Sequence, residues 1–239
     1  MRQSLTQLHT EPFAAEREWT VDGIPVLSAA VSLPQPVPAA DKVSRRIHRY
    51  YQLQARSFLR YCDRWLFPQA VAEYRAALAS SAPLPSLKAE LSYRVTYNND
   101  SFWSLYTQSR ESGLPGPALL TRWGDTWDLS SGYPVPLSSF FPSKSSWKRQ
   151  LLHQAEAEIT RQEKAGVSRY HESWRRELRR RFNPRHFYLS EEGIVWFYSM
   201  YAIAPATEGI PSFVLPFEAV RNWQPSGAVS TVDTQQEKA

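Results

Sequence analysis

Apolar residues recur at steps of three and four between residues 39 and 79, which is the spacing of one face of a helix. The members of this stripe are Val43, Ile47, Tyr50, Tyr51, Phe58, Cys62 and Trp65. We therefore expect a helix over 39–79. Asp41 suits the positive end of its dipole, and Pro68 is expected to kink or divide it because proline lacks a backbone donor.

Alternating apolar and polar positions predict strands on both sides of this helix. Residues 18–36 resemble a hairpin that turns at Asp22-Gly23, and the proline cluster at 34, 36 and 38 is expected to stop any strand. After a linker at 80–86, a three-stranded antiparallel meander is predicted over 87–132. Its first strand alternates Leu87, Ala89, Leu91, Tyr93, Val95 and Tyr97 on one face.

The C-terminal third predicts two helices followed by more strands. A first helix begins near a serine cap at 145–146 and ends at Gly166, the usual residue after a helix end. A second spans 168–182, with Trp174, Leu178 and Phe182 facing inward. A hairpin over 185–205 turns at 191–193, and residues 212–220 close the sheet.

Strands in runs and helices in runs indicate an α+β fold. We expect a mostly antiparallel sheet packed against a long N-terminal helix and a C-terminal helix pair. Residues 1–14 are predicted to be a flexible N-terminus, 15–223 one domain, and 224–239 a disordered tail rich in polar residues.

The motifs of the common enzyme classes are absent from the sequence. The nine glycines form no phosphate-binding motif, the single cysteine (Cys62) excludes an internal disulfide, and the five histidines are dispersed. His153 and Glu156 supply at most two ligands, fewer than a metal site needs. We therefore predict a protein that is not an enzyme, with no catalytic residue, cofactor or metal.

Three carboxylates are candidate acid–base groups. Asp125 and Asp128 are the best pair, but a strand edge followed by a Ser-Ser-Gly turn explains them structurally. Glu208 lies between Thr207 and Gly209 with no partner nearby in sequence, which favours the polar tip of a connection.

Arginine is concentrated between residues 169 and 185, a segment that contains seven arginines and two glutamates. Its net charge of +5 equals that of the whole chain. Guanidinium groups bind phosphate well, so this segment is a candidate surface for nucleic acid or another polyanion. Its members at one helical face are Arg175, Arg176, Arg179 and Arg180. The structural alternative is a solvated helix face.

Two segments resemble a known domain family. "FYLSEEGIVWFYSMYAIAPATEGIPSFVLPFEAV" and "WDLSSGYPVPLSSFF" carry a Phe-Tyr-Leu, an Ile-Ala-Pro and an Asp-Leu-x-x-Gly in the family's order. The family is the domain of unknown function shared by RsiV-type anti-sigma factors and PdaC-type peptidoglycan deacetylases. The resemblance covers about residues 15–223 and implies an α+β domain that is not itself an enzyme.

The resemblance also implies a function: a binding or sensing module of a bacterium. Its ligand is left open between lysozyme, another protein and a cell-wall component, and the alternative is a polyanion- or nucleic-acid-binding protein that uses residues 169–185. Trp123 and Trp127 are the aromatic interface candidates if they share one exposed face. No membrane span or signal peptide is found, which predicts a cytoplasmic chain, or an extracytoplasmic one if a leader or anchor was removed.

Overall fold

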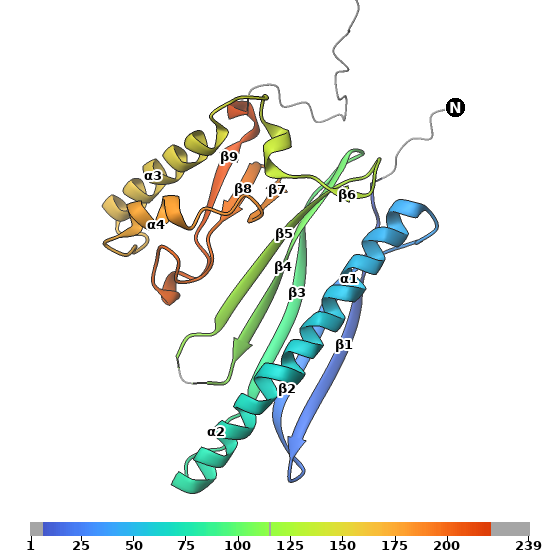
Figure 1. The fold of residues 1–239 in the computed structure, drawn as a ribbon, viewed down its shortest axis with the longest axis vertical. Coiled ribbons are helices and arrows are strands. Elements are labelled where there is room, and N and C mark those ends of the chain that lie inside the picture. The colour runs from blue at the N-terminus through green and yellow to red at the C-terminus, as the bar shows by residue number, and fades with distance from the viewer. Residues whose placement is uncertain (1–6, 115, 221–239) are drawn as a thin grey trace, which may run out of the picture.

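The computed structural model describes residues 7–114 and 116–220, which form two sheets with helices on their outer faces (Figure 1). The large sheet has six strands in the order β1-β2-β3-β4-β5-β6, and the small sheet has three in the order β7-β8-β9. The strands are β1 (Thr10–Val21), β2 (Ile24–Pro36), β3 (Leu87–Asn98), β4 (Phe102–Ser112), β5 (Leu119–Asp128), β6 (Tyr133–Pro134), β7 (Phe187–Ser190), β8 (Gly193–Phe197) and β9 (Ser212–Pro216). The predicted α+β class is confirmed.

Helices follow the strands in two groups. The N-terminal group is α1 (Lys42–Tyr61), a π-helical turn (Cys62–Leu66) and α2 (Phe67–Ser80); the C-terminal group is α3 (Trp147–Ala165) and α4 (Trp174–Arg180). Short 3-10 turns cover Leu137–Phe140, Ala206–Glu208 and Phe217–Ala219. No helix of the described residues is long and apolar enough to cross a membrane.

The large sheet is antiparallel except where β2 pairs with β3, because the α1–α2 crossover joins these strands in the same direction. The meander of β3, β4 and β5 is as predicted. The proline cluster ends the strand as predicted, although β2 passes Pro34 and stops only at Pro36. Prolines are tolerated there because β2 pairs with β3 only from Leu27 to Val31, so beyond that point the strand has β1 alone beside it.

The N-terminal boundary also differs from the prediction. Strand β1 begins at Thr10, inside the segment 1–14 that was expected to be flexible, and it pairs with β2 from Thr10 opposite Pro36 to Val21 opposite Ile24. Residues 1–6 and the predicted tail 224–239 lie outside the described residues. The turn between β1 and β2 is Asp22-Gly23, both with positive φ, as predicted.

The long helix is divided where Pro68 was expected to divide it. Asp41 caps α1 by accepting hydrogen bonds from the backbone N–H groups of Val43 and Ser44 at 2.7 and 2.9 Å. The turn at Cys62–Leu66 is π-helical, with the N–H of Phe67 donating to the carbonyl of Cys62. This wider turn accommodates the proline ring just after it.

Each sheet has its own core. Helices α1 and α2 bury Ile47, Tyr51 and Phe58 against one face of the large sheet. The small sheet packs against α3 and α4 through residues such as Leu151 and Trp174. The prediction that 212–220 closes a single sheet is therefore wrong, because β9 pairs with β8 in the small sheet.

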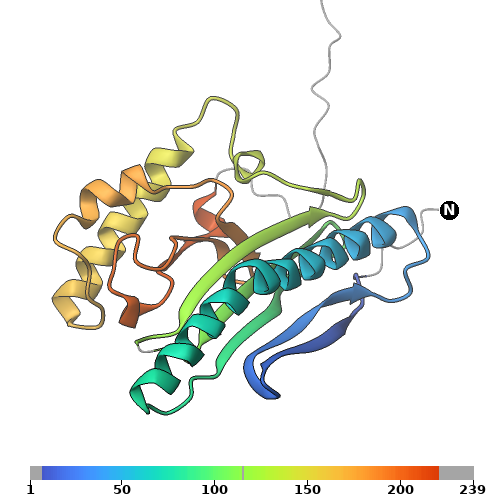
Figure 2. The ribbon, with the colours of Figure 1, turned by 60° about the horizontal axis from the view of Figure 1, so that its bottom comes forward.

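The small sheet rests on the face of the large sheet opposite α1 (Figure 2). The Oγ of Ser104 accepts the backbone N–H of Leu189 at 2.8 Å, and the Oγ1 of Thr96 donates to the carbonyl of Leu189 at 2.6 Å. Gly124 of β5 lies against the backbone of Phe187, where a Cβ atom would overlap the carbonyl oxygen. The absence of a side chain at 124 is what lets β7 approach.

The C-terminal helices differ in two details from the sequence expectation. Gly166 ends α3 in the left-handed conformation as predicted, with φ of 65°. Ser146 occupies the N-cap position, but its side chain makes no capping hydrogen bond. Helix α4 spans only Trp174–Arg180, so the helix expected over 168–182 is shorter by six residues at its start and two at its end.

Candidate functional site

The aromatic pair predicted as an interface does not form one. Trp127 is buried, with 2% of its surface exposed, whereas Trp123 is 42% exposed. Both side chains project to the α1 side of β5, but Trp127 packs edge-on against Tyr50 and Tyr51 of that helix. Because Trp127 belongs to the core, Trp123 is the only one of the two side chains that is exposed at the surface.

Trp127 is part of a hydrogen-bonded chain that includes a predicted carboxylate. Its Nε1 donates to the hydroxyl of Tyr51 at 3.0 Å, and this hydroxyl donates to Oδ2 of Asp125 at 3.1 Å. Tyr50 donates to Oδ1 of Asp125 at 3.3 Å. Burial raises the pKa of the Asp125 carboxyl to about 6, although the two tyrosine hydrogen bonds lower it.

The other carboxylates have structural partners as well. Oδ1 of Asp128 accepts hydrogen bonds from the backbone and the hydroxyl of Ser130 at 2.7 and 2.6 Å, so it shapes the turn after β5. Burial works against its ionisation, but these bonds outweigh it and hold the pKa of Asp128 below its usual range. Glu208 lies in the 3-10 turn Ala206–Glu208, which confirms the predicted connection. Asp125 and Asp128 are thus bound to different partners.

No group of three potential metal ligands occurs within residues 7–114 and 116–220. Of the two possible ligands His153 and Glu156, the glutamate already has a partner. Oε1 of Glu156 accepts a hydrogen bond from Arg179 at 3.0 Å.

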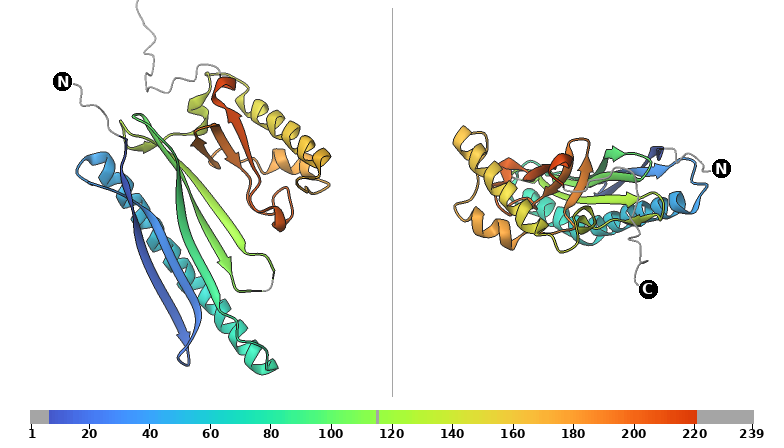
Figure 3. Two further views of the ribbon diagram at one scale, coloured as in Figure 1. Left: turned by 180° about the vertical axis from the view of Figure 1, so that it is seen from behind. Right: turned by 90° about the horizontal axis from the view of Figure 1, so that it is seen from above.

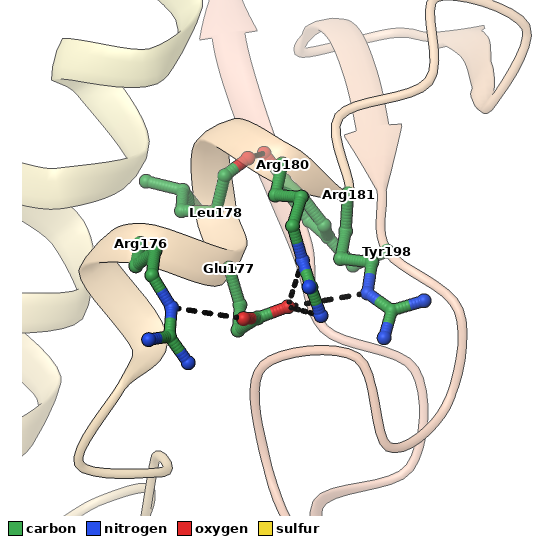
Figure 4. Close-up of polar contacts among 6 residues, drawn as sticks. All are labelled: Arg176, Glu177, Leu178, Arg180, Arg181 and Tyr198. Atoms are coloured by element: carbon green, nitrogen blue, oxygen red, sulfur yellow. Dashed lines mark hydrogen bonds and ion pairs between the residues drawn. The ribbon is translucent and has the colours of Figure 1, made fainter.

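The arginines of α4 are exposed on one face, as predicted, but most of them are paired. Glu177 is 6% exposed and contacts three of them, as Figure 4 shows. The closest distances from its carboxylate oxygens are 3.3 Å to Arg176, 2.7 Å to Arg180 and 3.2 Å to Arg181. Burial raises the pKa of Glu177, but the hydrogen bonds from these guanidinium groups outweigh it and lower the pKa below the usual range.

The remaining α4 arginines also have neighbours. Arg179 pairs with Glu156, and the guanidinium of Arg175 lies 4.2 Å from the ring centroid of Trp174. The helix is fixed beneath them by Leu178, which is fully buried and whose carbonyl accepts the hydroxyl of Tyr198 at 2.9 Å (Figure 4). Carboxylates thus neutralise part of the charge that the sequence assigns to this surface.

A second basic surface lies on α1, where sequence reasoning missed it. Residues 42–64 contain seven basic side chains and one acidic side chain, Asp63. Five exposed arginines recur along the outer face of α1 and of the π-helical turn that follows it; we call Arg45, Arg49, Arg56, Arg60 and Arg64 the arginine row. Within the described residues, none of the five forms an ion pair.

The arginine row points away from the sheet for a geometric reason. The buried positions of α1 include Ile47, Tyr51 and Phe58, and at about 100° per residue the row lies on the opposite side of the helix. The signal was present in the sequence as a run of twenty residues, 43–62, without a carboxylate. The apolar stripe of this segment predicts the helix, whereas only a count of the charges on its other face indicates the basic surface.

Large apolar side chains flank the row. Trp65 is 69% exposed, Leu53 is 49% exposed, and Tyr61 is 36% exposed with its hydroxyl donating to Glu111 at 3.2 Å. The apolar stripe predicted for 39–79 is therefore wrong at Trp65. The π-helical turn advances the chain by fewer degrees per residue than an α-helix, which rotates Trp65 out of the buried stripe.

The architecture defines a class of α+β protein in which a large, mostly antiparallel sheet carries a long helix on one face and a small sheet–helix unit on the other. Residues 138–218 match the family described as "Protein of unknown function (DUF3298)". The match confirms the expected resemblance of the C-terminal segment to a domain family of unknown function. No curated protein matches the chain.

Two solved structures share the fold. A DUF3298 family member from Bacteroides fragilis has 15% sequence identity and a TM-score of 0.65, and one from Pseudomonas aeruginosa has 17% identity and a TM-score of 0.58. Each comparison covers 90% of this chain and 93% of the other. At these identities the likeness concerns the fold, so the function is argued from the residues of this chain.

Proposed function

We propose that this domain is a non-catalytic binding module that holds an anionic partner on the arginine row of α1. The observation that carries the proposal is the set of five exposed arginines without ion pairs on one helix face. Unpaired guanidinium groups keep their donors available for phosphate or carboxylate. The α4 cluster, by contrast, has its own carboxylates.

The proposed absence of catalysis is supported by the structural roles of the two candidate acids, Asp125 and Asp128. Asp125 ties α1 to β5 through two tyrosines, and Asp128 shapes a turn. Each carboxylate has a structural role that accounts for its position. A binding role requires no reactive group, only a surface of matching charge.

The family resemblance suggests lysozyme as the partner, but the charge favours a different choice. Lysozymes of the animal type are basic, and the exposed feature on α1 is basic too. Fields of the same sign slow encounter and disfavour association. An acidic polymer or acidic surface therefore fits the arginine row better than lysozyme.

The test is calorimetric titration with long-chain inorganic polyphosphate at about 50 mM and about 200 mM NaCl. We expect binding that weakens with salt. The triple variant Arg49→Gln/Arg56→Gln/Arg60→Gln should make the negative slope of log K against log salt shallower by about two. The reason is that each of the three lost phosphate contacts releases about 0.7 counterions.

The matched control removes three positive charges from the opposite side of the large sheet. Lys88→Gln/Arg94→Gln/Arg110→Gln changes exposed side chains of β3 and β4 and leaves α1 intact. Equal weakening by both triples would show that net charge, not the row, attracts the ligand. A one-to-one complex with lysozyme that survives added salt, with no polyphosphate binding, would overturn the proposal in favour of the resemblance.

The third variant separates the two basic helices. Arg175→Gln/Arg176→Gln/Arg179→Gln removes the same charge from α4. We expect it to bind polyphosphate nearly as well as the wild type, since two of these three arginines are paired with carboxylates. Loss of binding in this variant alone would assign the anionic partner to residues 169–185.

A further inference from the structure

The arginine row follows a straight and convex ridge. Helix α1 has twenty residues and is about 30 Å long, so a step of four residues advances about 6 Å. The helix lies on the outside of the large sheet (Figure 2; Figure 3, left), and its buried residues pack against that sheet. The five guanidinium groups therefore lie along the outer side of this helix and of the turn that follows it, with a shallow hollow between Arg45, Arg49 and Arg56. A crest can touch a plane at all five positions at once.

Exposed apolar side chains accompany the charges along the ridge. Leu53 interrupts the row in its middle, and Trp65 follows directly after its last member, Arg64. A ligand that offers only charge gives no reason to leave a tryptophan 69% exposed. Tryptophan is enriched where membrane headgroups meet the acyl chains, and arginine can extend its charged end into the headgroup layer.

From this combination we propose that the ridge docks on an anionic lipid surface, with the arginine row among the headgroup phosphates and Trp65 and Leu53 entering the layer beneath. The proposal rests on the proposed function, because it uses the same row and names the partner. The contact is peripheral, with the helix lying along the surface. Its strength is electrostatic for the most part, since two apolar side chains anchor weakly by themselves.

The strength can be expressed as a change in partitioning. Each basic residue close to an anionic surface contributes roughly a fivefold gain in partition coefficient. Replacing Arg49, Arg56 and Arg60 by glutamine should therefore weaken vesicle binding by about a hundredfold. The control triple at Lys88, Arg94 and Arg110 lies on the other face of the sheet and should weaken it much less.

The experiment is vesicle co-sedimentation of the full chain with phosphatidylcholine vesicles that contain roughly a third phosphatidylglycerol, and with pure phosphatidylcholine vesicles. We expect binding to the anionic vesicles only. Trp65→Ala should reduce it severalfold and leave polyphosphate binding unchanged, because only the lipid surface has an apolar layer. Thermal unfolding of each variant checks that it folds; Trp65 is exposed, so its replacement leaves the core intact.

The outcomes separate this inference from the proposed function. Polyphosphate binding without vesicle binding overturns the lipid proposal and leaves the anionic module in place. Binding of a single-stranded oligonucleotide that Trp65→Ala abolishes identifies nucleic acid as the partner instead, since bases stack on tryptophan. Equal loss of vesicle binding in the α1 triple and the control triple also overturns the docking ridge.

Discussion

Replacement of Asp125 by asparagine tests how α1 is fixed to β5. The Asp125 carboxyl lies between the hydroxyls of Tyr50 and Tyr51, and burial raises its pKa from 3.8 to about 6. The folded state therefore holds a proton between about pH 4 and pH 6 that the unfolded state has released. Because the folded state binds more protons in this window, stability falls as the pH rises through it.

The magnitude follows from the size of the shift. About two pKa units at 1.36 kcal/mol each make the ionised carboxylate cost about 3 kcal/mol above pH 6. Asparagine removes the charge, but its amide cannot accept both tyrosine hydrogen bonds, which costs about 1 kcal/mol. Asp125→Asn should thus stabilise the fold by about 1–2 kcal/mol at pH 7, and no longer at pH 4.

The measurement is urea unfolding followed by tryptophan fluorescence, repeated between about pH 2 and pH 8. Asp128→Asn is the matched control and should behave in the opposite way. The pKa of Asp128 is lowered, so its stabilisation is present above the unfolded value of 3.8 and is lost as the pH falls through the folded value. A wild-type stability that stays flat from pH 4 to pH 6, or an Asp125→Asn variant destabilised at pH 7, would refute the reasoning.

Four further substitutions test the packing, the buried carboxylate of α4 and the helix ends. Gly124→Ala should destabilise the fold by about 3 kcal/mol, because the new methyl group overlaps the Phe187 carbonyl. Gly166→Ala meets open space and should cost only about 1 kcal/mol, the strain of a left-handed backbone at a residue with a side chain. Urea unfolding distinguishes the two. Glu177→Gln should lower the thermal midpoint at pH 7, and the difference from wild type should shrink as the pH falls and the wild-type carboxylate is protonated. Asp41→Ala should cost about 1 kcal/mol of unfolding free energy by removing the N-cap, and a midpoint equal to wild type would contradict that role.

Local patterns allowed much of the fold to be predicted. The helix stripe, the alternation in β3, the Asp22-Gly23 turn and the end of α3 at Gly166 each depend on residues close together in the chain. The assignment of β9 to a second sheet depends on which strands meet in space. Because β5 is approached from the other face by β7 at Gly124, the last strands are held in a separate layer instead of extending the first sheet.

The site was less accessible to sequence reasoning than the fold. The sequence does not distinguish Trp127 from Trp123, since both lie on the same side of β5. Only the position of α1 over one end of β5 buries Trp127. Likewise, the charge count at 169–185 includes Glu177 but gives no sign that this one carboxylate contacts three arginines at once. The arginine row was countable, because its charges lie close together in the chain and need no tertiary contact to be recognised.

The location of the arginine row bears on how functions can be transferred within the family. The DUF3298 match covers residues 138–218, which build α3, α4 and the small sheet, whereas the row lies between 45 and 64 on the other face of the large sheet. Exposed arginines on a helix crest can change without disturbing the core that Tyr51 and Phe58 form beneath them. A relative with the same fold and a different α1 surface would therefore keep the domain and lose the proposed anionic partner, so we expect ligand binding to follow the charge of α1 rather than the family match.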